Sequence, residues 1–277
     1  MTGIWNNIKT ILLMAGLMGL CLGIGYLIGG QAALVPALAI GAVMNFFAYF
    51  FSDKIALATM RAIQITRQDD PVVWDITERL SRKAGLPMPR LYFSPAAAPN
   101  AFATGRGPSH SAVCVTAGLR QILNENELEG VIAHELTHIK HRDILISSIV
   151  AVFAGAISWL SYMAFWGGGD RDRRSNPLIA ILLMVLAPLA AMLIQLAISR
   201  SREYEADRIG SEIAGGGRGL ANALLKLEQA SKHVPLPVPD SQRSMFIVEP
   251  LTASGISKLF MTHPSTEDRI KRLMQRP

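Results

Sequence analysis

The chain has 277 residues and a net charge of +6, and three long segments, residues 10–52, 144–169 and 175–199, carry no charged side chain. All 27 Lys+Arg and all 21 Asp+Glu lie in the remainder, at a density ordinary for a soluble domain. This distribution excludes a disordered chain, a collagen and a purely soluble enzyme, and it argues against a protein made only of membrane helices.

Four apolar segments are long enough for membrane-spanning helices, which need about 20 apolar residues. Residues 10–52 supply two of them, divided near Gly29-Gly30-Gln31, and residues 144–166 and 178–198 supply one each. We interpret the first as an anchor rather than a cleaved signal peptide, because it is long and leads directly into a second apolar segment. For the second pair, a buried hairpin in a soluble domain is the alternative.

The basic residues beside these segments predict the orientation of the chain. Eight Lys and Arg residues lie next to one end of the apolar segments, and three lie in the loop at 167–177. Because Lys and Arg are enriched on the cytoplasmic side of membranes, we expect both termini in the cytoplasm. The remaining basic charge is spread thinly, which fits attraction to an anionic lipid bilayer and argues against a nucleic-acid partner.

Between the two apolar pairs, the chain alternates between helix and strand signals. Residues 53–70 are expected to continue a helix away from the membrane. Asp70-Pro71 then begins a helix as N-cap and first-turn proline, and Gly85 ends it. Short strands are expected at residues 90–93, 100–105 and 112–116, the second of them at a sheet edge.

The helix expected at 124–143 is the most informative, because His134-Glu135-Leu136-Thr137-His138 fits the pattern H-E-x-x-H. Its N-terminus is marked by a capping-box pair, Asn124 and Glu127. Positions i and i+4 share a helix face, so both imidazoles can bind one metal ion while Glu135 reaches a metal-bound water. Two surface histidines on a helix are the alternative, which the capped amphipathic context disfavours.

A catalytic zinc ion has three protein ligands, so the third must come from elsewhere. After the fourth apolar segment, a polar helix is expected at 199–230, and Glu203 and Asp207 share a face of it while Glu205 does not. The 144–198 hairpin brings this helix to the same membrane side as the histidines. Glu203 is therefore a candidate ligand and Asp207 a candidate to orient a ligand histidine. A solvated acidic turn is the alternative on spacing alone.

Together these motifs closely resemble the HtpX family of membrane zinc metalloproteases, which are relatives of the CaaX prenyl-protein endopeptidases. The likeness covers nearly the whole chain in order and includes residues 84–89, 100–105, 201–207, 260–264 and 268–270. It implies a zinc-dependent endopeptidase of the inner (plasma) membrane, with its catalytic domain in the cytoplasm. It also implies that the substrates are proteins, above all misfolded membrane proteins in quality control.

The resemblance also implies a role for each matching residue. His134, His138 and Glu203 would hold one Zn²⁺ per chain, with Glu135 as the catalytic acid/base and Asp207 at the family's E-x-x-x-D position. Three further residues match segments thought to line the site. Asn100 lies in the segment expected to pair with substrate, Arg269 lies in the last helix, and His263 would stabilise the oxyanion or serve as a structural histidine before Pro264.

The expected fold class is a mainly α membrane protein. It has four transmembrane helices in two hairpins and a zincin-like α+β catalytic domain with a small β-sheet. The expected parts are the first hairpin (1–52), the first part of the catalytic domain (53–143), the second hairpin (144–198) and the second part of the catalytic domain (199–277).

Three other functions are alternatives to this one. A zinc sensor without turnover is disfavoured because Glu135 and all three ligands are present. An ion-coupled carrier would need ionisable residues within the apolar segments, which have none. A prenyl-protein endopeptidase is the nearest enzymatic alternative, but those relatives are longer and have more membrane spans.

Overall fold

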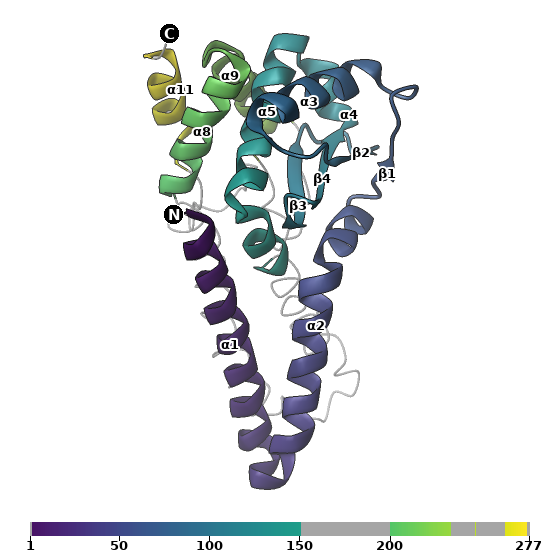
Figure 1. The fold of residues 1–277 in the computed structure, drawn as a ribbon, viewed down its shortest axis with the longest axis vertical. Helices are drawn as coiled ribbons and strands as arrows, with labels where there is room; N and C mark the ends of the chain where they lie inside the picture. Colours follow the sequence, from purple (N-terminus) through teal and green to yellow (C-terminus); the bar gives the residue numbers. More distant parts are fainter. Residues whose placement is uncertain (1, 151–199, 234–246, 248–263, 276–277) are drawn as a thin grey trace.

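The computed structural model describes residues 2–150, 200–233, 247 and 264–275 of the chain. In this part, a long helical hairpin extends from one side of a unit in which helices surround a small sheet (Figure 1). The second hairpin predicted at 144–198 lies outside the described residues from residue 151 onward. The mainly helical fold with a small sheet agrees with the prediction, and two of the four predicted membrane helices can be located.

The hairpin consists of α1 (Thr2–Gly29), a short 3₁₀ turn (Gly30–Ala33) and α2 (Leu34–Thr59). The chain turns at Gly30, whose φ of +59° suits glycine, close to the predicted division. Both helices are long and apolar enough to cross a membrane by length and composition. Large apolar side chains are exposed along them, among them Leu12, Val35, Leu38, Val43 and Phe47. Such a surface fits contact with lipid.

The sheet has four strands in the order β1-β2-β4-β3. They are β1 (Ile63–Gln64), β2 (Arg90–Ser94), β3 (Ala101–Gly107) and β4 (His110–Thr116). Only β2 and β4 are parallel, and β3 is an outer strand, as predicted. The expectation of a helix through residues 53–70 is wrong, because the chain turns at Arg61 (φ +49°) and then pairs with β2.

Besides the helical residues 143–150, the described part of the chain contains six further helices: α3 (Pro71–Ala84), α4 (Ala117–Ile122), α5 (Glu125–His141), α8 (Arg200–Ala214), α9 (Arg218–His233) and α11 (Thr266–Met274). Asp70 caps α3 and left-handed Gly85 ends it, as predicted. The single helix expected at 199–230 is interrupted at Gly215, whose φ of +89° ends α8. The helix α4 carried no clear sequence signal.

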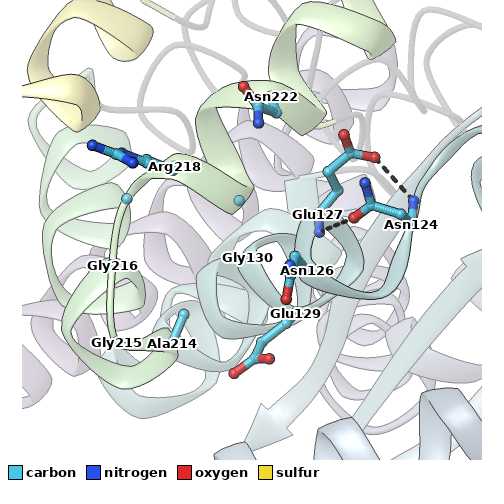
Figure 2. Close-up of a pocket in the computed structure, with 12 residues that line it drawn as sticks. Asn124, Asn126, Glu127, Glu129, Gly130, Ala214, Gly215, Gly216, Arg218 and Asn222 are labelled. Carbon is cyan, nitrogen blue, oxygen red and sulfur yellow. Dashed lines mark hydrogen bonds between the residues drawn. The ribbon is translucent and has the colours of Figure 1, made fainter.

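Helix α5 lies at the centre of the unit, between the sheet, α3, α8 and α9 (Figure 1). It begins with the predicted capping box, in which Asn124 and Glu127 exchange hydrogen bonds (Figure 2). Its apolar face is fully buried, and Gly130 allows α9 to approach, since a Cβ there would lie 2.4 Å from the Leu220 nitrogen. Close packing on several sides fixes the direction of the side chains that α5 carries.

Candidate metal centre

The two histidines of α5 and one carboxylate of α8 converge on a single point. His134 Nε2 and His138 Nε2 are 3.2 Å apart, and each lies 3.6 Å from an oxygen of Glu203. Ligand atoms about 2.1 Å from one zinc ion at the tetrahedral angle lie about 3.4 Å apart. The spacing therefore fits one metal ion held by two nitrogens and one carboxylate oxygen, a donor set that suits zinc.

Glu203 reaches this point because α8 crosses α5 closely at His134. The crossing occurs at Gly210, where a Cβ would lie 3.0 Å from the His134 backbone nitrogen. Two turns earlier on α8, the Glu203 side chain is buried beside both imidazoles. Glu205 instead pairs with Arg208 at a half-exposed position on another side of α8, as its helical phase predicts.

Each imidazole has a carboxylate on the nitrogen that faces away from this point. His134 Nδ1 lies 3.0 Å from Asp207 Oδ1, and His138 Nδ1 lies 3.3 Å from Asp143 Oδ2. A carboxylate that accepts the Nδ1–H hydrogen bond fixes the tautomer in which Nε2 has its lone pair available for a metal. This arrangement on both rings is a second observation that fits a metal ion.

A buried ion pair holds the first of these carboxylates. Arg269 of α11 donates to both oxygens of Asp207, at 2.9 and 2.7 Å, and also to the Ile247 carbonyl at 3.0 Å. Burial would raise the pKa of Asp207, but the charges of Arg269 and His134 outweigh it and hold that pKa at about 2. Asp207 is therefore an anion throughout the physiological range, fixed behind His134.

The second carboxylate, Asp143, was not predicted from the sequence. It follows the left-handed turn at Arg142 that ends α5, and it is 4% exposed. Besides His138, it accepts hydrogen bonds from Asn6 Nδ2 at 2.7 Å and Arg202 Nη1 at 3.3 Å. The sequence does contain one indication of its role. Asp143 is the last charged residue before a 26-residue uncharged segment, and a carboxylate that is buried next to such a segment needs hydrogen-bond or ion-pair partners.

Glu135 lies between the histidines and the sheet. Its Oε2 accepts a hydrogen bond of 2.8 Å from the backbone nitrogen of Ala103, on the outer strand β3. The side chain is 6% exposed, and burial raises the pKa of Glu135 more than the neighbouring charges of His134 and His138 lower it. A carboxylate with a raised pKa beside a candidate metal site is suited to accept and return a proton.

The remaining predicted residues lie in different environments. Asn100 is fully buried just before β3, where its backbone nitrogen donates to Thr116 and its Oδ1 accepts from the Ile247 nitrogen. It thus anchors the start of the outer strand β3, which begins at the next residue. His263 lies outside the described residues. Arg269 is in the site, but it contacts Asp207 behind the histidines.

A separate hollow of about 400 Å³ lies at the other end of α5 (Figure 2). It is lined by Asn124, Glu127 and Glu129 and by the glycine-rich turn between α8 and α9. His134 and His138 lie in the second half of α5, so this hollow does not belong to the metal centre.

Comparison with known proteins finds relatives that are similar in sequence or in fold. Residues 67–277, more than three quarters of the chain, match the family described as Peptidase family M48. A protein described as Protease HtpX homolog from Pelotomaculum thermopropionicum is 50% identical over 97% of this chain and 98% of its own length. A Protease HtpX homolog from Pyrococcus furiosus is also 50% identical, over 98% of this chain and 95% of its own length.

The crystal structure of S. mikatae Ste24p has the same fold, with a TM-score of 0.54 at 16% identity. The match covers 98% of this chain, which spans 66% of the length of that one. The family assignment rests on the sequence matches. The chain belongs to peptidase family M48 and is a relative of the HtpX proteases.

Proposed function

We propose that the chain is a zinc-dependent endopeptidase held in a membrane by its N-terminal hairpin. The observation that carries this proposal is the convergence of His134, His138 and Glu203, whose ligand atoms lie within 4.8 Å of one another beside Glu135. Membership of a peptidase family supports hydrolysis of peptide bonds, and the two apolar helices support membrane embedding.

Each residue of the site then has a distinct part in the reaction. Zinc bound by His134, His138 and Glu203 would supply a Lewis acid that polarises the scissile carbonyl and makes water acidic. The carboxylate of Glu135 takes the proton of the attacking water and passes it to the leaving amine. Before the reaction, the Ala103 backbone N–H holds that carboxylate in place.

The outer strand β3 supports an extended protein segment as the substrate. Its neighbour in the sheet is β4, and within the described residues no strand pairs with its other side. Backbone pairing along such an edge gives affinity with little demand on sequence. This recognition suits a protease of misfolded membrane proteins, which is the role we propose, with the active site in the cytoplasm.

Glu135→Gln tests this function directly in the purified, detergent-solubilised chain. The variant should retain one zinc per chain, as measured by elemental analysis. Its rate of casein cleavage should fall by about 10²-fold or more, because only the proton carrier is removed. Glu125→Gln is the matched control, since Glu125 is an exposed residue of the same helix. A zinc-loaded Glu135→Gln variant that cleaves at the wild-type rate would overturn the assignment. Membrane embedding is tested separately, by retention of the chain in carbonate-washed membranes.

A further inference from the structure

A pocket lies where the membrane hairpin meets the sheet, at a distance from the residues assigned to catalysis. Its volume is about 510 Å³, and its walls come from the end of α2, the beginning of β2 and the turn between β3 and β4. We call it the α2–β3 pocket, and its main lining residues are Phe46, Phe50, Lys54, Arg90, Arg106 and His110.

The pocket lies at the level expected for phospholipid headgroups. From Leu34, where α2 begins, to Phe51 the helix rises about 26 Å, close to the thickness of a hydrocarbon core of about 30 Å. Lys54 follows within one further turn. Phe46 and Phe50 are 52% and 42% exposed, and such apolar rings suit the hydrocarbon just below the headgroups.

Two cations of this pocket lack an acidic partner in the described part of the chain. Lys54 Nζ lies 5.1 Å from the centre of the Phe51 ring, and Arg106 Cζ lies 5.2 Å from that of Phe50. The third cation differs, because Arg90 pairs with Asp53 at 2.9 Å. The pocket therefore combines a net positive charge with an exposed aromatic wall.

We propose that the α2–β3 pocket binds an anionic glycerophospholipid. Its phosphate would lie between Lys54 and Arg106, and its acyl chains would follow the exposed phenylalanine face of α2 toward the centre of the bilayer. The two basic side chains would make charge-assisted hydrogen bonds to the phosphate, and the phenylalanine face would make apolar contacts to the acyl chains. A lipid can make both kinds of contact, whereas a soluble anion can make only the first, so the pocket favours a lipid. The proposal rests on the membrane embedding proposed above.

A lipid bound at Arg106 would also affect the active site, because Arg106 and a residue that contacts Glu135 lie on the same strand. Arg106 lies three residues after Ala103 on β3, about 10 Å along the strand, and Ala103 holds the Glu135 carboxylate. A lipid bound at Arg106 would thus steady the strand that supports the proton carrier and offers its edge to substrate.

Native mass spectrometry of the full chain in detergent tests the proposal without any need for proteolysis. The chain is titrated with dioleoyl phosphatidylglycerol or dioleoyl phosphatidylcholine, and glycerol 3-phosphate is added as a soluble competitor. We expect phosphatidylglycerol to be retained preferentially and glycerol 3-phosphate not to displace it. The double variant Lys54→Gln, Arg106→Gln should reduce this preference about 25-fold, since each basic residue near an anionic lipid contributes about fivefold.

Two further double variants test whether the lipid preference depends on positive charge at residues 54 and 106. Lys54→Arg combined with Arg106→Lys keeps both charges and should keep the preference. Arg218→Gln combined with Lys271→Gln removes the same charge from exposed positions on α9 and α11, at the far end of the unit, and should also keep it (Figure 1). An unchanged preference in the double Gln variant, an equal loss in the distant pair, or displacement by glycerol 3-phosphate would overturn the proposal. Failure of the chain to remain in washed membranes would instead concern the proposed function.

Discussion

Asn6 of α1 donates a hydrogen bond of 2.7 Å to Asp143, 137 residues later in the chain. A second hydrogen bond from the same amide, also 2.7 Å, reaches the carbonyl of His141 at the end of α5. Asp143 in turn contacts His138 Nδ1. The first apolar helix is therefore bonded to the group that orients one of the two histidines, so the packing of the hairpin and the geometry of the metal centre depend on each other.

We predict that Asp143 is a positioning residue for the metal. Asp143→Ala should weaken zinc binding by about 10–100-fold, as losses of carboxylates that orient ligand histidines do. Asn6→Ala should have a smaller effect, because Arg202 still contacts Asp143. In the double variant the two effects should be less than additive, since both act through the same ring.

Zinc affinity of the four proteins, measured by competition with a chromogenic chelator, checks this prediction. Asn45→Ala is the matched control, because Asn45 is a buried hairpin asparagine whose amide donates to the Met14 carbonyl, away from the metal centre. Unchanged affinity in Asp143→Ala, or an equal loss in the control, would contradict it.

The sequence predicted the elements whose signals are local. Helix α5 carries its capping box, its apolar face and the H-E-x-x-H pattern within 17 residues. The spacing of Glu203 and Asp207 predicted a shared face, and the structure places both beside His134. The edge position of β3 also followed from the pattern of short strands and the turn at Gly105.

The parts that were missed depend on contacts between distant segments. Asn6 and Arg202 are ordinary polar residues in the sequence, and only the fold places both against Asp143. Strand β1 has two residues and exists because β2 lies beside it. The break at Gly215 separates α8 from α9, which lets α9 pack on α5 at Gly130 while α8 crosses at His134. None of these contacts has a periodic signature along the chain.

A second prediction ranks the three acidic residues of α8 by zinc content after purification. Glu203→Ala should lose zinc most severely, because it removes a ligand. Asp207→Ala should weaken binding by about 10–100-fold, since it releases His134 and removes the carboxylate that accepts two hydrogen bonds from the buried Arg269. Glu205→Ala should be mild, because its partner Arg208 also contacts Glu212. Full zinc occupancy in Glu203→Ala with loss in Glu205→Ala would show that the third ligand has been misassigned.

A third prediction concerns orientation in the membrane. The turn of the hairpin and α11 lie at opposite ends of the structure (Figure 1). The excess of Lys and Arg on the domain side predicts that a cysteine at Gln31 is labelled by an impermeant maleimide in intact cells. A cysteine at Glu267 should react only after permeabilisation. Both variants are built on Cys21→Ala, while Cys114 is fully buried. The reverse labelling pattern would place the catalytic domain outside.

A fourth prediction follows from the charge that surrounds His134. Burial lowers the pKa of this imidazole, but hydrogen bonds with Asp207 and Glu203 outweigh it and raise the pKa to about 9. In the metal-free protein His134 is therefore protonated at neutral pH, and zinc must displace that proton. A raised pKa favours the protonated, metal-free form below pH 9, so zinc affinity should fall as the pH is lowered from 9 to 7.

The expected change in zinc affinity is about tenfold per pH unit for one released proton, and it is steeper if His138 releases one as well. Competition titrations with a chelator of known pH dependence measure it. Affinity that is constant between pH 7 and 9 would show that the imidazole is already neutral there.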